Sequence, residues 1–262
     1  MQQRTRRLAL SDLLRSRWLS PLLLVLAWEL ACDTGLIPPH TLAAPSSVLG
    51  TLRDMLASGE LPSNVAVSLR RAVLGFSIGS GLGIVLALCA GLARSGDAII
   101  DPLIQVKRSI PVVALTPLFI IWFGIGETTK IALIAFASLL PVYINLHNGV
   151  RGVDVRLVDA ARSFGLGRLQ LIRHVILPAA LPSLLTGLRY AMSVSVLMLV
   201  IAEQVNASEG LGFLMINARD AMRTDIIVVC LFVYALLGLT GDALVRAIER
   251  RLLAWRPTLM EA

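Results

Sequence analysis

The chain has 262 residues, of which 56% are hydrophobic and 16% charged, and its formal net charge is +7. A soluble domain is about half apolar and a quarter charged, so the apolar excess indicates burial in a lipid bilayer. The arginines stand at the ends of apolar segments, which favours membrane topology over binding to nucleic acid. The three cysteines and three histidines show no ligand spacing, so we expect neither a disulfide framework nor a metal site.

Six apolar stretches are long enough to cross the hydrocarbon layer, which takes about 20 helical residues. They are residues 19–37, 72–93, 109–126, 131–150, 183–205 and 226–245. We therefore predict an all-α membrane protein with a cytoplasmic N-terminal segment over 1–18 and one transmembrane domain of six helices over 19–262. A cleaved signal peptide is the alternative for the first stretch, but Glu29 and Asp33 interrupt its apolar region.

The basic residues predict the orientation of these spans. An even number of spans places both termini on one side, and 17 of the 24 Lys and Arg residues then fall on that side. Short cytoplasmic loops carry the excess of positive charge in membrane proteins. We therefore expect both termini and the segment 151–182 to lie in the cytoplasm.

Glycine and proline mark individual positions within the spans. Gly75, Gly79 and Gly83 recur at every fourth residue, which places them on one helix face and predicts close packing against another helix. Pro111, Pro117 and Pro141 lie inside predicted spans, where a proline is expected to kink the helix.

The segment between the fourth and fifth spans is short, polar and amphipathic. We predict a helix over about 154–168 whose regular part ends near Gly165, and a following helix that starts near Leu177-Pro178. Asp159 and Arg162 are three residues apart and can pair on its polar side. Small residues at 160 and 161 offer little area to lipid and favour docking into a protein groove.

The motif DAARSFG, with VILP nine residues further on, resembles the cytoplasmic-loop signature of permease subunits of bacterial ABC importers. That signature reads Glu-Ala-Ala, three residues, Gly, nine residues, then Ile, any residue, Leu-Pro. Asp159 and Val175 replace its Glu and Ile conservatively, and the other signature positions match. The resemblance implies that eight residues couple the chain to an ATPase: Asp159, Ala160, Ala161, Arg162, Phe164, Gly165, Leu177 and Pro178.

Longer stretches resemble the subgroup that imports nitrate, taurine and aliphatic sulfonates, with aliphatic sulfonate permeases the most similar. They include LRRAVLGFSIGSGLGIVLAL, PLFIIWFGIGETTKIALI, PVYINLHNGVRGVD and VIAEQVNASEGLGFLM. The resemblance implies a subunit of the bacterial inner membrane that works with a second copy of itself and two ATPase subunits. It also implies an extracytoplasmic binding protein, which we expect to dock on segments 38–65 and 206–225.

The sequence lacks the GxxxxGK[ST] phosphate loop, so we expect this chain to bind no cofactor and to leave ATP and Mg²⁺ to the partner subunit. An ion-driven secondary transporter is an alternative that would need ionisable relays or an internal repeat. An intramembrane enzyme would need a nucleophile with a base, or metal ligands. The expected cargo is a small organic anion such as an aliphatic sulfonate, with nitrate, taurine and bicarbonate as alternatives.

Two charged residues within the fifth span are candidates for the translocation pathway or its gate. Arg189 could attract an anionic group, although we favour a structural role for it, either snorkelling or between helices. Glu203 could line an outer gate, or it could hold the segment 206–225 through a salt bridge. Both interpretations of Glu203 stay open from the sequence.

Overall fold

The computed structural model describes residues 19–205 and 207–255, and these residues form helices and turns without a β-strand. The predicted cytoplasmic segment 1–18 lies outside the described residues. Two compact units are present. The described part of the first comprises residues 19–62 and 214–231, and that of the second comprises 63–205, 207–213 and 232–255.

The first unit contains two complete helices, α2 (Leu19–Asp33) and α3 (Pro45–Ala57), with parts of α11 (Leu211–Asp220) and α12 (Thr224–Leu252). Pro45 occupies the first turn of α3, where its missing N–H leaves no bond unmade. The carboxylate of Glu29 on α2 accepts a hydrogen bond from the Ser46 N–H at 3.0 Å, so an acidic residue inside the first predicted span caps the next helix.

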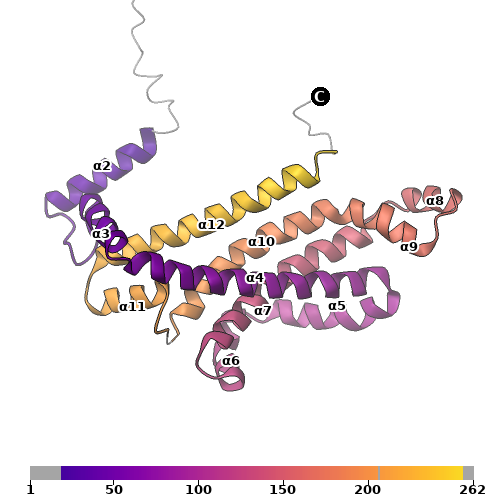
Figure 1. Ribbon diagram of the computed structural model, residues 1–262, viewed down its shortest axis with the longest axis horizontal. Helices are drawn as coiled ribbons and strands as arrows, with labels where there is room; N and C mark the ends of the chain where they lie inside the picture. Colours follow the sequence, from indigo (N-terminus) through magenta and orange to yellow (C-terminus); the bar gives the residue numbers. More distant parts are fainter. Residues whose placement is uncertain (1–18, 206, 256–262) are drawn as a thin grey trace, which may run out of the picture. The chain divides into compact units, whose positions relative to one another are not determined.

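The second unit contains nearly all of α4 (Glu60–Leu92) and the helices that follow it up to α10 (Figure 1). These are α5 (Arg94–Ser109), α6 (Thr116–Phe123), α7 (Glu127–Arg151), α8 (Val155–Ser163), α9 (Arg168–Leu171) and α10 (Leu177–Glu203). The start of α11 and the part of α12 from residue 232 also belong to this unit. α7 and α10 pack against each other along most of their length. A core of small and aliphatic side chains from α4, α5, α7 and α10 surrounds Tyr143, which is buried in α7.

The glycine face of α4 packs against α7, as the four-residue spacing predicts. A Cβ atom added at Gly75 would lie 2.6 Å from the Ile134 side chain, and one at Gly79 would lie 2.1 Å from the Ala135 carbonyl oxygen. At Gly83 the nearest atom would be the Leu139 carbonyl oxygen, at 2.8 Å. The two backbones therefore approach more closely than any side chain on these positions would allow.

Four described helical runs are long and apolar enough to cross a membrane: Glu60–Leu92, Glu127–Arg151, Arg168–Glu203 and Thr224–Leu252. They cover the predicted fourth and sixth spans completely, and the second and fifth to within two residues of their ends. A bent pair of helices brings the number to five if it counts as one span. The first predicted span corresponds to α2, of which the structure describes 15 residues, Leu19–Asp33. The total of six spans stays a prediction.

The third predicted span, 109–126, is wrong as a single helix. The chain bends by 92° between the helix that ends at Ser109 and the one that begins at Val112. Ile110 is extended, with φ −99° and ψ 119°, because the ring of Pro111 disfavours a helical conformation at the preceding residue. Pro117 lies in the first turn of α6, so it starts a helix and does not kink one.

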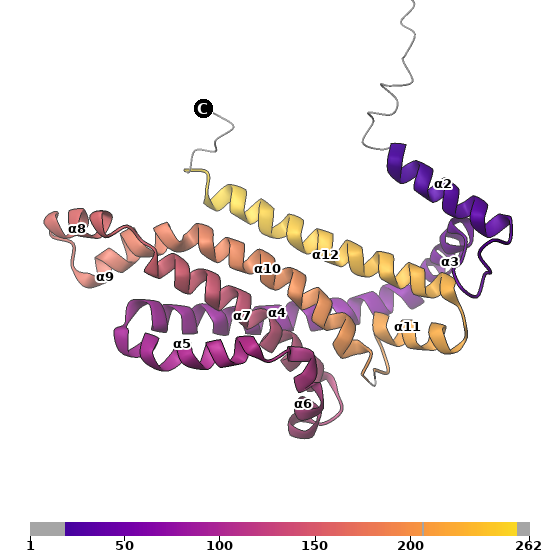
Figure 2. The same cartoon turned by 180° about the vertical axis from the view of Figure 1, so that it is seen from behind.

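The helix predicted to start near Leu177-Pro178 is confirmed, because α10 starts at Leu177. It continues through Pro182 into the fifth predicted span, 183–205. Figures 1 and 2 show α8 and α9 together at one end of the α7–α10 pair, next to the first turns of α10. The polar segment between the fourth and fifth spans is therefore a compact projection from the end of the helix pair.

Candidate functional site

The polar projection is built around α8, which has well-defined ends. The Asp154 side chain accepts a hydrogen bond from the Arg156 N–H at 2.9 Å and caps the start of the helix. Gly165, with φ +80°, ends it in the left-handed conformation. The Leu166 N–H then bonds the Ala161 carbonyl at 3.2 Å, which is the six-to-one bond of a Schellman motif. α8 is shorter than the predicted range 154–168, because the chain turns at Gly165.

The outer surface of α8 exposes apolar side chains. Leu157 is 55% exposed and Phe164 is 85% exposed, whereas Ala161 is buried. The remaining predicted coupling positions of α8, Asp159, Ala160, Arg162 and Gly165, are exposed. Asp159 and Arg162 form the predicted ion pair at 3.7 Å, but both side chains are about two thirds exposed, so the pair contributes little stability.

A π-helical turn, Ile172–Ile176, connects α9 to α10 just before Pro178. Proline has no N–H to offer the carbonyl four residues earlier, that of His174, and its ring excludes close approach. The wider turn accommodates this missing bond, and such turns are frequent at functional sites. Leu177 and Pro178, the last two predicted coupling residues, are exposed in the first turn of α10, so they form part of the same projection as α8.

Arg189 lies on α10 and faces two carboxylates of α12. Its Nη2 atom is 2.5 Å from Glu249 Oε2, and its Nε atom is 3.4 Å from Asp242 Oδ1. Asp242 also pairs with Arg246 at 2.8 Å, so two cations and two anions balance here. Because its charge is already matched, these contacts favour the interhelical ion pair over attraction of an anionic substrate.

Glu203, at the C-terminal end of α10, is completely buried and accepts hydrogen bonds from four groups. The donors are Ser68 Oγ at 2.7 Å, Arg71 Nη1 at 2.6 Å, the Gly212 N–H at 3.0 Å and Tyr234 Oη at 2.7 Å. A buried carboxylate this well hydrogen-bonded has no oxygen available for a passing solute. These contacts favour the interpretation in which Glu203 holds the segment after residue 206.

Arg71 is the counterion of Glu203, and its side chain is only 1% exposed. Its Nη1 atom also donates to the Glu209 carbonyl at 2.8 Å. Its Nε and Nη2 atoms donate to the two carboxylate oxygens of Glu127 at 2.7 and 2.5 Å, in the bidentate geometry that suits a guanidinium. We call Asn64, Ser68, Arg71, Glu127, Glu203 and Tyr234 the Glu203 cluster.

The sequence interpretation missed every member of the Glu203 cluster except Glu203 itself. One signal was present: Asn64, Ser68 and Arg71 follow the i, i+4, i+7 spacing of one helix face. A polar stripe of this kind at the start of an apolar helix indicates a buried polar partner. Its partners, at positions 127, 203 and 234, are too distant in the sequence to be paired with it by pattern alone.

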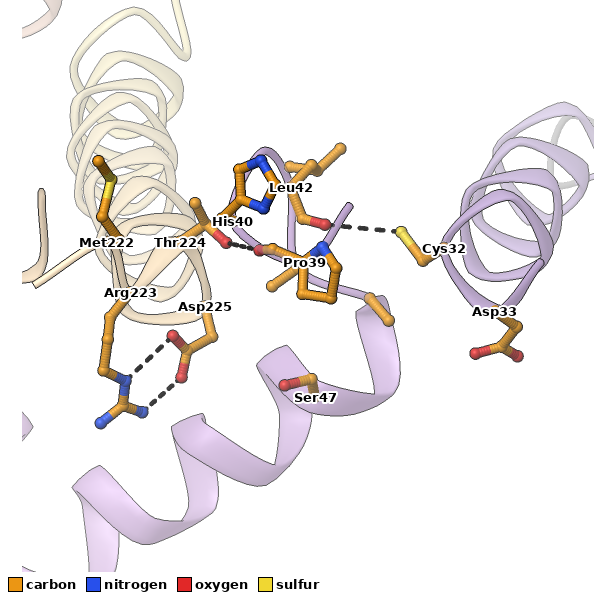
Figure 3. Close-up of a pocket in the computed structure, with 12 residues that line it drawn as sticks. Cys32, Asp33, Pro39, His40, Leu42, Ser47, Met222, Arg223, Thr224 and Asp225 are labelled. Carbon is orange, nitrogen blue, oxygen red and sulfur yellow. Dashed lines mark hydrogen bonds and ion pairs between the residues drawn. The ribbon is translucent and has the colours of Figure 1, made fainter. Parts of the chain in front are cut away.

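The first unit holds a pocket of about 460 Å³ between residues 32–47 and 222–225 (Figure 3). Thr224 Oγ1 donates to the Pro39 carbonyl at 2.8 Å, and Arg223 pairs with Asp225 at 2.5 Å. The hydrogen bond to Asp225 raises the pKa of the Arg223 guanidinium above its ordinary value. Residues from the two segments predicted to dock a binding protein, 38–65 and 206–225, therefore line one pocket in this unit.

Within residues 19–205 and 207–255, no three His, Cys, Asp or Glu side chains are placed to hold a metal ion. Long apolar helices, a bent helix pair and a compact polar projection define an integral membrane protein of the transport class. The chain belongs to the family described as the binding-protein-dependent transport system inner membrane component, whose model matches residues 79–254. It is therefore an inner-membrane permease component and not an enzyme.

Several relatives are similar over most of the chain. The aliphatic sulfonates transport permease protein SsuC of Escherichia coli strain K12 is 44% identical over 240 residues, which are 92% of this chain and 91% of SsuC. SsuC of Bacillus subtilis strain 168 is 39% identical, with 91% and 86% covered. The taurine transport system permease protein TauC of Escherichia coli strain K12 is 36% identical, with 88% and 86% covered.

Solved structures of ABC transporters share the fold. A chain of an amino acid ABC transporter aligns with a TM-score of 0.61 at 22% identity and covers 76% of this chain and 97% of its own length. A chain of the MetNI methionine ABC transporter, in an inward-facing conformation, aligns with a TM-score of 0.51 at 20% identity, with 72% and 94% covered. The arrangement of helices is thus that of an ABC transporter permease.

Proposed function

We propose that this chain is the permease subunit of an ATP-driven importer of aliphatic sulfonates. The observation that carries the proposal is the 44% identity with SsuC over 92% of the chain. The similarity to TauC supports it, because taurine is itself an alkanesulfonate and the two named cargoes share the sulfonate group. Nitrate and bicarbonate, the alternatives from sequence, lack an alkyl chain.

The proposal assigns the energy source to a separate subunit. Without a phosphate loop this chain takes no part in ATP hydrolysis, so ATP and Mg²⁺ belong to the partner. The exposed apolar side chains of Leu157 in α8 and of Phe164 just after it are the contact through which the ATPase moves the permease. Two permeases and two ATPases make up the complex, in which each ATPase receives one α8.

The orientation follows from the distribution of positive charge. α8 carries Arg156 and Arg162, and Arg151 and Arg168 flank it, which supports a cytoplasmic location. Both termini then lie in the cytoplasm, and the pocket of the first unit faces the extracytoplasmic side. A sulfonate-loaded binding protein docks on that side and delivers its cargo to the permease.

Reconstitution in proteoliposomes tests this function. The permease is reconstituted with its ATPase and its binding protein so that the ATPase faces the lumen, which contains ATP. The uptake of labelled butanesulfonate into the lumen is then measured. We expect uptake that requires ATP and the binding protein. Unlabelled taurine or ethanesulfonate should compete with butanesulfonate, because all three compounds carry the sulfonate group. Competition by nitrate alone, or uptake by the permease without the ATPase, would contradict the proposal.

A further inference from the structure

We infer that the Glu203 cluster is a mechanical linkage that ties the start of α11 to the coupling segment. The inference rests on the proposed function, because it names the route by which a docked binding protein signals to the ATPase. One end of the linkage is the N-terminus of α11, the other is α8, and the connecting element is α10.

Three backbone amides at the start of α11 donate hydrogen bonds to side chains of other helices. Its first amides have no acceptor within the helix. The Gly210 N–H instead donates to Asn64 Oδ1 at 2.7 Å, the Leu211 N–H to Ser68 Oγ at 2.9 Å, and the Gly212 N–H to Glu203 Oε2 at 3.0 Å. A carboxylate is also the charge that a helix N-terminus attracts. α11 is thereby fixed to α4 and α10 at its first residues.

Two glycines bring the chain close enough for this contact. Gly210 has φ +106°, and a Cβ atom there would lie 2.5 Å from both Arg71 Nη1 and Glu203 Oε1. A Cβ atom on Gly212 would lie 2.4 Å from the Cβ atom of Glu203. The segment therefore lies directly on the carboxylate, and a displacement of Glu203 displaces the start of α11 with it.

Arg71 fixes the position of the carboxylate. A buried ion pair is a weak source of stability, because apolar residues of similar volume often stabilise the same site as well or better. The buried ion pair of Arg71 matters here for position more than for stability, since one guanidinium bonds Glu203, the Glu209 carbonyl and Glu127. Three segments of the chain are thus joined at one cation. Tyr234 also connects α12 to the cluster, because its hydroxyl donates a hydrogen bond to Glu203.

α10 connects this cluster to the coupling segment. Residues 168–203 form one helical run of 36 residues, which is about 54 Å long at 1.5 Å per residue. α8 ends at Ser163, only a short turn before that run begins. A continuous packed element is the physical means by which two distant sites influence each other. Force applied at the start of α11 therefore reaches α8 through α10.

The test measures the ATPase rate of the reconstituted complex with and without binding protein loaded with butanesulfonate. The ratio of the two rates is the stimulation. We expect Glu203→Gln and Ser68→Ala to lower it by about fivefold or more, the lower bound of typical coupling between sites. A role limited to stability would lower the amount of folded complex and leave the stimulation of the remaining complex unchanged.

Asp97→Asn is the matched control. Asp97 on α5 pairs with His147 at 2.9 Å and Arg151 at 3.1 Å, so this variant removes a carboxylate from an ion cluster that has no contact with α11. We expect it to keep the wild-type stimulation. Tyr234→Phe removes one hydroxyl from the cluster and provides a mild second variant if Glu203→Gln assembles poorly.

The outcomes separate the linkage from the proposed function. Normal stimulation in both Glu203→Gln and Ser68→Ala would overturn the linkage while leaving the importer intact. An equal loss of stimulation in Asp97→Asn would also overturn the linkage, because removal of any carboxylate would then have the same effect. A wild-type complex that takes up no sulfonate and shows no stimulation would overturn the proposed function together with the linkage.

Discussion

Gly79 is where the backbone of α4 comes closest to α7. A Cβ atom at this position would meet the Ala135 carbonyl carbon and oxygen, and backbone atoms cannot rotate away as a flexible side chain can. Gly81, two residues further along the same helix, has no atom within 4 Å of its Cβ position. The two glycines therefore differ in packing while they share a helix and a residue type.

We predict that Gly79→Ala lowers the thermal stability of the purified permease, with a destabilisation of about 1–3 kcal/mol from overpacking. Gly81→Ala is the control, and it should hold or raise the stability because alanine is the better helix former by about 1 kcal/mol. The melting temperature in detergent, followed by intrinsic fluorescence, measures both variants. Equal melting temperatures would show that the helices separate easily at this face.

Some contacts of single residues could be predicted from the sequence, and others could not. The spacing of Gly75, Gly79 and Gly83 was sufficient to predict close helix packing, because spacing on a helix maps directly onto a face. The ion pair of Arg71 and Glu203 was not predictable in the same way. It joins positions 132 residues apart, and periodicity within a segment gives no register between segments.

α8 is the element whose sequence specifies its structure most completely. Its local signals, Asp154 at the start and Gly165 at the end, need no partner in the rest of the chain to act. The bend near Pro111 depends on more than the proline, because Pro141 lies inside the continuous helix α7. The sequence predicted a kink at both positions, and only the position near Pro111 became a break.

We predict that Phe164→Asp weakens binding of the ATPase to the permease without unfolding it. Phe164 is 85% exposed, so its replacement removes no internal contact. Burial of a phenylalanine side chain contributes about 2 kcal/mol, which corresponds to roughly 30-fold in affinity. Co-purification of the tagged ATPase with each permease variant measures the effect, alongside the melting temperature of the permease alone.

Leu36→Asp is the control for this experiment, because Leu36 is 81% exposed and lies outside the coupling segment. It should retain the ATPase. Full retention in Phe164→Asp as well would remove α8 from the proposed interface and direct attention to the exposed start of α10, at Leu177 and Pro178.

At the scale of the whole molecule, charge predicts the orientation and hydropathy predicts most of the spans. Both signals sum over many residues, so a single interruption does not hide them. They work less well where a span is bent, as at the α5–α6 pair, because a window of average hydropathy does not register a change of direction. The number of crossings is therefore best decided by labelling.

We predict that a cysteine at Ser163 reacts only from the cytoplasmic side and a cysteine at Leu36 only from the outside. Both positions are exposed, and the native Cys32, Cys89 and Cys230 are first replaced by alanine. A membrane-impermeant maleimide is applied to intact spheroplasts and, separately, to lysed membranes. Leu36→Cys should react in both preparations and Ser163→Cys only after lysis, because positively charged loops stay in the cytoplasm.

Reaction of Ser163→Cys in intact spheroplasts would place α8 outside the cell, where it could not contact an ATPase. Reaction of both cysteines only after lysis would instead mean that an even number of crossings separates them, as when the bent pair of α5 and α6 enters the bilayer and returns on the same side.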